Sequence, residues 1–509
     1  MFANFEVLLS LFLKYWQSRL TKGKGSVIAE NTIVLAVHED WPGGAGNALG
    51  TLYAYQNASK LAKAEFGLDI DEKLRSGEIS VALYHTAGKG TRMAPLPGAE
   101  NNNKPGVKLP ANVNLEGKPT AITILESVVK QTGCYAKSRR GRLSVFWGDQ
   151  VFIPTVDVTY TPAYHADILC SLGPMLTETE WAEKGMDKYG LIAVTRGGAA
   201  AQVEKVTHSQ AMELLQHLDS IESVGASLGS FSVSSNLLFA LLQEFSADLA
   251  SKEEKLDSDP HLWMPFTLEK GSYLGVMLGK GVSNEVAALH YDRMASMLEK
   301  FNADEANSKL GIFGPVDVGP SPCWWDYGQL KLYSKFSKMM IDDTEEAGFM
   351  RSFFRVSDSD RKAGSHLGET LTDDASVVGM CNISSGNIKD SILINVHCKN
   401  IDANGCIIMN VTADSVVAKA DSIIYNRIST DALATEVGAV STGVTKSDGT
   451  QVIINSKMSV DGGKAWDEKV GDNEYTFGEV HGKVNADADP SELESVNTQL
   501  HDEARRSMK

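Results

Sequence analysis

The sequence is poor in cysteine and contains no disulfide framework. Its six cysteines form no CxxC pair, and a chain of 509 residues can bury a core without disulfide bonds. We therefore expect reduced thiols and a cytoplasmic location.

Long apolar runs are also missing. The longest one near the N-terminus, VLLSLFL, lies between Glu6 and Lys14 and is too short to span a bilayer. No basic segment precedes it and no small-residue cleavage site follows it. We interpret residues 1–30 as an amphipathic helix that packs on the body of the protein or on another subunit and does not insert stably into a membrane. A membrane-surface or targeting role is the alternative.

Positive charge is scarce as well. The formal net charge is −17, which argues against extended contact with nucleic acid or anionic membrane and leaves room only for a local basic cleft. The sequence further lacks a Walker A motif, because no GKS or GKT closes its glycine loop, and it lacks a complete GxGxxG fingerprint.

What is present, over residues 31–345, is an alternation of strand-like and helix-like segments. Such alternation predicts an α/β fold with a mixed, mostly parallel, Rossmann-like sheet wrapped by helices, and ligands then bind beyond the carboxyl ends of the strands. The expected strands are NTIVLAV (31–37), ISVALY (79–84), LSVFW (143–147) and YGLIAV (189–194), and the expected helices cover residues 50–67, ending at Gly67, and 118–131, beginning near Pro119.

The pattern changes after about residue 375, where short apolar runs recur with an asparagine behind them. One strand per repeat predicts a parallel β-helix over residues 346–485, in which stacked asparagines hydrogen-bond along the ladder. An antiparallel β-sandwich is the alternative. The repeat centres are Val378, Leu393, Ile408, Ile423 and Ile453, and the asparagines are Asn395, Asn410, Asn426 and Asn455. Over residues 486–509 we expect a charged tail that forms an exposed helix or a partly disordered segment.

The loop HTAGKGTRM follows the strand ISVALY directly. Gly88 and Gly90 allow a tight turn whose N–H groups can point at phosphate oxygens. Lys89 and Arg92 add positive charge, and a guanidinium can hold two oxygens at once. The loop is therefore either a phosphate site or a plain turn.

The segment AGKGTRM, residues 87–93, resembles the signature loop of sugar-1-phosphate nucleotidyltransferases, and the bacterial N-acetylglucosamine-1-phosphate uridylyltransferases in particular. Further segments match the family in order: two lysines in NNNKPGVKLP, then GKP, VFWGDQVF, KYGLIAV with VEK, and CWWDYGQ. One is out of order. The segment GGAGNALGTLYAYQNA, residues 43–58, resembles the family's base-recognition segment but precedes the signature loop, which implies a permuted catalytic domain.

The resemblance implies the transfer of a nucleotidyl group from an NTP, with UTP favoured, to a sugar 1-phosphate. It implies Mg²⁺ on Asp149 and Asp326. The implied catalytic residues are Arg92, Lys108, Asp149 and Asp326. The implied nucleotide-binding residues are Ala87, Gly88, Lys89, Gly90 and Thr91 with Gly50 and Thr51, where residues 42–50 hold the base and Thr51 opens a helix. The implied sugar-side residues are Gly190, Glu204 and Lys205 with Lys104, which is an alternative to Lys108.

Two departures leave the function open. ASLGSF, residues 226–231, stands where the family has an asparagine-containing segment, so the sugar is not determined. The permuted order also admits a non-catalytic subunit that binds nucleotide sugars without turnover. We expect no nucleic-acid partner, and a homo-oligomer formed through the β-helix or the N-terminal helix is compatible with the sequence.

Overall fold

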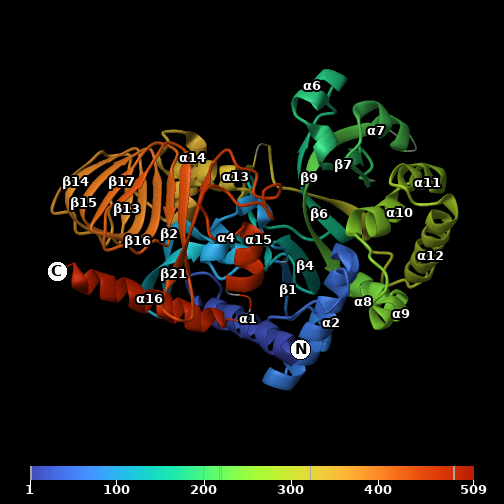
Figure 1. Ribbon diagram of the computed structural model, residues 1–509. Coiled ribbons are helices and arrows are strands. Elements are labelled where there is room, and N and C mark those ends of the chain that lie inside the picture. Colours follow the sequence, from blue (N-terminus) through green and yellow to red (C-terminus); the bar gives the residue numbers. More distant parts are fainter. Residues whose placement is uncertain are drawn as a thin grey trace.

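The structure is a computed structural model that describes residues 3–508, except residues 87, 199, 217, 219, 321, 485 and 487, with backbone alone over residues 3–11. A mixed α/β body is followed by a β-solenoid that lies beside it (Figure 1). The expected parallel β-helix is therefore confirmed, and the antiparallel sandwich is excluded.

A seven-stranded mixed sheet forms the centre of the body. β1 pairs with β4 and β6 pairs with β10 in parallel, whereas the long β9 runs antiparallel to β4, β6 and β7. The sheet is mixed, as expected, but it is not mostly parallel, because four of these six strand pairings are antiparallel, including that between β7 and β8. The strands are β1 (Val81–His85), β4 (Arg142–Trp147), β6 (Tyr164–Gly173), β7 (Gly190–Thr195), β8 (Ala200–Glu204), β9 (Ile221–Ser234) and β10 (Gly311–Asp317).

Helices and loops bury both faces of this sheet. Along β4, Val145 faces a cluster with α2 and α8, while the next residue, Phe146, faces Tyr135 and Phe152 on the opposite side. Because side chains alternate along a strand, the consecutive apolar residues Val145, Phe146 and Trp147 fit a strand covered on both faces. The helices of the body are α2 (Gly46–Phe66), α3 (Ile70–Arg75), α4 (Leu96–Ala99), α5 (Ile124–Thr132), α6 (Glu178–Glu183), α7 (His208–Leu214), α8 (Ser235–Glu244), α9 (Ser246–Ser251), α10 (Met264–Thr267), α11 (Lys270–Gly279), α12 (Asn284–Asn302), α13 (Leu330–Lys338) and α14 (Glu345–Phe354).

Two of the expected elements differ from the structure. Residues 31–37 form no strand. Residues 118–123 form β3 (Lys118–Thr123), paired with β2 (Lys108–Leu115), so Pro119 lies in a strand and the helix begins only at Ile124. Thr123 explains the start: its hydroxyl accepts from the Glu126 amide, and the Glu126 carboxylate accepts from the Thr123 amide. The expected end of α2 at Gly67 is confirmed by its left-handed φ of 63°.

The solenoid strands are buried on both faces. In β15, Leu393 points into the solenoid, whereas Ile392 and Ile394 pack against the body. This double burial explains runs such as ILI, IIM and IIY, in which no polar residue alternates. The strands are β12 (Glu369–Thr372), β13 (Val377–Gly379), β14 (Asn382–Lys389), β15 (Ile392–Asn404), β16 (Ile407–Thr412), β17 (Ser415–Ala418), β18 (Ile423–Tyr425), β19 (Leu433–Thr435), β20 (Ala439–Thr445) and β21 (Gln451–Lys457).

An asparagine ladder runs along the solenoid. The Asn395 amide donates to Asn410 Oδ1 and the Asn410 amide donates to Asn426 Oδ1, each at 2.6 Å, and all three residues have a positive φ. The expected ladder is thus confirmed for these three residues. It does not include Asn455, because β21 turns back antiparallel to β20, and Asn455 instead accepts a hydrogen bond from Ser441.

The strict spacing of 15 residues also ends within the solenoid. Val378, Leu393 and Ile408 align as expected, but Ile408 aligns with Ile424. One inserted residue therefore turns Ile423 toward the body, where it joins the core shared with the solenoid.

The charged C-terminal segment is an ordered helix, α16 (Pro490–Ser507), that lies along the solenoid next to α1 (Ala3–Lys22) (Figure 1). His501 is buried, and the Asn497 amide donates to Asn426 Oδ1 at 2.9 Å. The expected terminal helix is confirmed, but it is docked and only partly exposed, because it supplies polar partners to the ladder. Arg19 of α1 forms an ion pair of 2.9 Å with the fully buried Glu126 and another with Glu494 of α16.

Two properties bear on the expectations from composition. All six cysteines are free thiols, and five of them are buried. Within the described part of the chain, no helix has both the length and the apolar character needed to cross a membrane.

We predict that Asn410→Ala lowers the free energy of unfolding by about 2 kcal/mol, because it removes two ladder hydrogen bonds and places alanine at φ 54°, a left-handed conformation that asparagine adopts more readily. Asn387→Ala, at an exposed asparagine of β14, is the control and is expected to change stability by less than about 0.5 kcal/mol. Urea unfolding monitored by circular dichroism provides the comparison. Equal stability of the two variants would contradict a structural role for the ladder.

Candidate functional site

Two carboxylates from distant parts of the chain meet beside the glycine loop. Asp149 follows β4, and Asp326 ends β11 (Cys323–Asp326), which pairs with β5 (Gln150–Ile153) in a register that sets Asp326 opposite Gln150. A Cβ placed on Gly328 would lie 2.9 Å from Asp326 Oδ1, 3.1 Å from Asp149 Oδ2 and 3.8 Å from Arg92 Nη2. Three of the residues that the resemblance implies therefore surround one point.

Lys104 is the fourth charged member of this group. It begins the short helix η2 (Lys104–Gly106), and its ammonium group forms an ion pair with Asp149 Oδ2. Only 14% of the Lys104 side chain and 22% of the Asp149 side chain are exposed. A partly buried ion pair of this kind is screened less by solvent than a surface pair.

The charge balance around Asp326 is unfavourable to its ionised form. Burial raises the pKa of Asp326 above its ordinary value, and the negative charge of Asp149 adds to the shift. The Gly328 N–H, which donates to Asp326 Oδ1 at 2.7 Å, and the cations Lys104 and Arg92 act in the opposite direction. The pair therefore gains from additional positive charge.

The glycine loop has the conformation that its sequence predicts. Gly88 has φ 114°, and Gly90, with φ 67°, precedes the short helix η1 (Thr91–Met93) that carries Arg92. A Cβ on Gly90 would lie 2.9 Å from Lys104 Cβ, so the loop packs directly on the residue that reaches Asp149. Lys89 and Arg92 are exposed. Ala87 lies outside the described residues.

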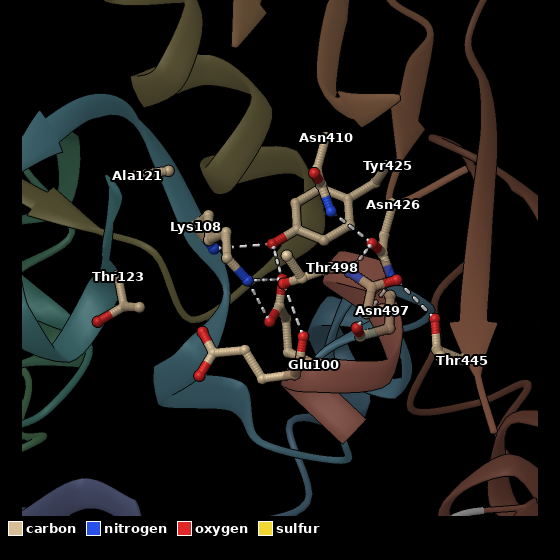
Figure 2. Close-up of polar contacts among 12 residues, drawn as sticks. Glu100, Lys108, Ala121, Thr123, Asn410, Tyr425, Asn426, Thr445, Asn497 and Thr498 are labelled. Atoms are coloured by element: carbon tan, nitrogen blue, oxygen red, sulfur yellow. Dashed lines mark hydrogen bonds and ion pairs between the residues drawn. The ribbon is translucent and has the colours of Figure 1, made fainter. Parts of the chain in front are cut away.

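Lys108 does not join this group. Its ammonium group binds Glu100 at 2.6 Å, its backbone N–H donates to the Tyr425 hydroxyl at 2.8 Å, and its carbonyl accepts from Tyr333 (Figure 2). The Tyr425 hydroxyl in turn donates to Glu100 at 2.5 Å. Lys108 thus belongs to the contact between the body and the solenoid, and Lys104 is the lysine next to Asp149.

The expected base-recognition segment is helical for most of its length. α2 begins at Gly46, so Thr51 does not open the helix and both Gly50 and Thr51 lie within it. The Thr51 hydroxyl is 3.0 Å from His85 Nε2, at the end of β1. Burial lowers the pKa of His85 to about 4, so this ring is neutral near pH 7. This hydrogen bond links α2 to the strand that precedes the glycine loop.

The segment that replaces the family's asparagine lies at the same end of the sheet. Gly229, with φ 75°, leaves room for the indole of Trp147, because a Cβ there would lie 2.4 Å from Trp147 Nε1. The Trp147 ring is 5.3 Å from the His85 ring. Residues 226–231 therefore approach the glycine loop through an aromatic residue.

Three of the four expected sugar-side residues, Gly190, Glu204 and Lys205, lie together at the β7–β8 hairpin. Gly190 is paired opposite Glu204, and Glu204 forms ion pairs with Lys205 at 2.9 Å and Lys280 at 3.4 Å. Tyr189, next to Gly190, contacts Trp324 of β11 with ring centroids 5.6 Å apart. This aromatic contact connects the hairpin with the strand that ends at Asp326.

A half-buried acid, Asp259, which belongs to none of the motifs above, lies next to this hairpin. Asp259 begins the π-helix η5 (Asp259–Trp263), and Gln202 Nε2 approaches its carboxylate at 3.5 Å. Burial, followed by the charge of Glu204, raises the pKa of Asp259 to about 7. Gln202 Oε1 is buried and has no hydrogen-bond partner among the described residues. The hairpin thus contains a buried acceptor without a partner among the described residues, beside the carboxyl groups of Glu204 and Asp259.

Some residues near the site could not be selected from the sequence, because tertiary contacts place them there and they belong to no recognisable motif. Glu100 and Tyr425 are 325 residues apart, and Asp259 sits in a segment with no family counterpart. Gly328 belongs to the CWWDYGQ segment, but its position between Asp149, Asp326 and Arg92 depends on the β5–β11 pairing. Among the residues that the structure describes, no cluster of three or more His, Cys, Asp or Glu side chains could hold a metal ion, so the Asp149–Asp326 pair would supply two ligands only.

We predict that Asp259→Asn changes the pH dependence of stability. Native Asp259 keeps its proton up to about pH 7, whereas an unfolded aspartate ionises near pH 4, so the wild-type stability contribution is lost as pH rises between these values. The variant should match the wild type at about pH 3.5, below this range, and be more stable by about 1 kcal/mol or more at pH 8. Urea unfolding at both pH values, with the exposed Glu253→Gln as control, provides the measurement. A pH-independent difference would contradict the raised pKa.

Comparison with known proteins does not supply a family. No protein-family model matches the chain, and a search of the curated proteins finds no significant match. The evidence for function therefore consists of the geometry of this charged group and the resemblance of its motifs.

Proposed function

We propose that this protein transfers a nucleotidyl group from an NTP, with UTP favoured, to a sugar 1-phosphate and releases pyrophosphate. One observation carries the proposal: Asp149, Asp326 and Arg92, which are distant in the sequence, meet at Gly328 beside a glycine loop, and Lys104 forms an ion pair with Asp149. A nucleotidyltransferase with a Rossmann-like body is the fold that these motifs indicate.

The residues present fit Mg²⁺. Two neighbouring carboxylates form the hard oxygen donor set that Mg²⁺ prefers, and Mg²⁺ commonly uses only one or two carboxylates together with phosphate oxygens and water. When bound, the ion would neutralise negative charge on the reacting phosphates.

The chain itself supplies the remaining positive charge and the hydrogen-bond donors. The reaction joins a sugar-phosphate oxygen to the α-phosphorus and breaks the bond from that phosphorus to the oxygen leading to the β-phosphate. The attacking oxygen is anionic at neutral pH, so no protein base is required and the catalytic task is to position and neutralise crowded charge. The exposed Arg92 and the amides of residues 88–91 are suited to the leaving pyrophosphate.

Lys104 is suited to a second role. Its ammonium group holds Asp149 and lowers the pKa of Asp326, so in the protein without metal it acts as the counter-cation of the carboxylate pair. Binding of a divalent cation at the pair would free Lys104 to contact a phosphate oxygen. This role replaces the one expected for Lys108, which is held by Glu100.

The β7–β8 hairpin is suited to hydroxyl groups of a sugar. The Glu204 carboxylate can accept hydrogen bonds, and Gly190 opposite it has no side chain, since a Cβ there would lie 2.8 Å from Gln202 Nε2. The preference for UTP comes from the resemblance of the AGKGTRM and LGT motifs to uridylyltransferases.

A second candidate is a non-catalytic nucleotide-sugar-binding subunit. Two observations favour it: Lys108 is occupied by Glu100, and the Gly50 amide lies inside a helix and not in an open loop. The retention of two convergent aspartates favours the enzyme, because a pure binding protein has little need of them.

We predict that Asp149→Asn reduces pyrophosphate release by a factor of about 10² to 10⁴, because it removes one charge from the proposed metal site while preserving shape. The assay measures pyrophosphate from UTP and a panel of sugar 1-phosphates in the presence of Mg²⁺. Asp187→Asn, at an exposed aspartate on the surface, serves as control and should retain wild-type turnover. Full activity of Asp149→Asn would remove the metal site, and absence of turnover by the wild type with retained UTP binding would favour the binding subunit.

We further predict that Lys104→Met increases the affinity of the nucleotide-free protein for Mg²⁺ by roughly tenfold, because it removes the cation that competes for Asp149. Isothermal titration calorimetry with MgCl₂ alone provides the measurement, and Lys118→Met, at an exposed lysine of β3, is the matched control. Unchanged or weaker Mg²⁺ binding by Lys104→Met would show that Lys104 does not occupy the position of the metal charge.

A further inference from the structure

The C-terminal module, residues 458–484, packs directly on the glycine loop. A Cβ on Gly462 would lie 2.4 Å from the Thr91 carbonyl oxygen and 2.9 Å from Ala94 Cβ. The backbone of the module thus contacts the segment that carries Arg92 with no room for a side chain between them.

Apolar packing also holds the C-terminal module against the glycine loop. Ala94 belongs to a buried cluster whose other members all lie beyond residue 440, namely Val444, Ile454, Phe477 and Val480. The body contributes Ala94 alone, so this cluster ties the residue after η1 to the end of the solenoid and to the module. Burial of such a cluster contributes stability only while the loop remains in this position.

Polar contacts extend the attachment toward Lys104. The Asn102 amide donates to the His481 carbonyl at 2.9 Å. A Cβ on Gly98 would lie 2.9 Å from Val480 Cγ1, which shows the close packing of α4 on the module. The module therefore contacts the chain at Thr91, Ala94, Gly98 and Asn102, on the way from Arg92 to Lys104.

The solenoid anchors the other end of this segment. Glu100 accepts a hydrogen bond from Tyr425 and binds Lys108, and Asn426 donates to the Ala99 carbonyl at 3.4 Å (Figure 2). Both cations of the charged group, Arg92 and Lys104, are therefore carried by a segment that the C-terminal half of the chain holds from two sides.

We propose that the C-terminal module sets the shape of the glycine loop, with Gly462 as a positioning residue for Arg92 and for the amides of residues 88–91. The module then contributes to the phosphate site by positioning the loop, in addition to any role of the solenoid as a scaffold or as a surface for oligomer formation. The expected effect of the module on ligand binding rests on the proposed phosphate-binding function of the loop. The expected effect of the module on the conformation of the loop rests on packing alone.

Adjacent glycines provide a matched test. Gly462→Ala forces a Cβ into the Thr91 carbonyl, whereas in Gly463→Ala the nearest atom is the flexible Asp461 carboxylate at 3.3 Å. Neither glycine has a positive φ, so the two variants differ in space and not in backbone strain. Hydrogen–deuterium exchange of peptides covering residues 88–94 should be at least about tenfold faster in Gly462→Ala and unchanged in Gly463→Ala. The dissociation constant for magnesium pyrophosphate should rise by about tenfold or more in Gly462→Ala only.

A second pair of variants covers the case in which Gly462→Ala does not fold. Asn102 and Asn101 both have left-handed backbones, with φ 62° and 59°, so glycine fits either position. Asn102→Gly deletes the hydrogen bond to His481 and should accelerate exchange at residues 88–94, while Asn101→Gly should leave it unchanged.

The inference is overturned if exchange in the loop is the same in Gly462→Ala and Gly463→Ala, or if Gly462→Ala accelerates exchange throughout the chain. Failure of the proposed function has a different signature: the wild type neither binds magnesium pyrophosphate nor turns over UTP with any sugar 1-phosphate, while the difference in loop exchange between the two variants persists.

Discussion

The repulsion between two carboxylates at Gly328 is the constraint on which the site depends. Asp149 and Asp326 are brought together by the β5–β11 pairing, although burial, with a further contribution from the charge of Asp149, disfavours the ionised form of Asp326 and raises its pKa. The fold offsets this cost with Lys104, Arg92 and the Gly328 amide. A partly buried carboxylate pair beside a glycine loop is suited to a divalent cation and to the phosphates that accompany it, which is the physical basis of the proposed transferase.

The second half of the chain contributes to that site by holding its cations in place. The segment from Arg92 to Lys108 has no sheet to support it, and it is held by the Glu100–Lys108–Tyr425 cluster on one side and by the C-terminal module on the other. The asparagine ladder and α16 stabilise the solenoid in turn. The stability of the solenoid and the geometry of the charged group are therefore linked through direct contacts.

Local patterns in the sequence predicted the local features of the fold. The end of α2 at Gly67, the strands around residues 81, 145 and 190, the asparagine ladder and the convergence of Arg92, Asp149 and Asp326 all depend on a strong periodicity, a glycine or a recognised motif. Features decided by tertiary contacts could not be predicted in this way. Lys108 and Lys104 carry the same charge in the same short segment, and only the presence of Glu100 and Tyr425 on one side determines which of them reaches Asp149. The antiparallel β9, the docked α16 and the half-buried Asp259 likewise depend on distant partners.

The central claim is that Asp149 and Asp326 together bind one divalent cation next to the glycine loop. Anomalous diffraction from crystals soaked with MnCl₂ and UTP tests it most directly, because Mn²⁺ replaces Mg²⁺ at oxygen sites and can be located without ambiguity. The account predicts an anomalous peak within coordination distance of both carboxylates, with the Lys104 ammonium group displaced from Asp149. A peak elsewhere, or an Asp149–Lys104 ion pair unchanged in crystals that contain bound nucleotide, would contradict it.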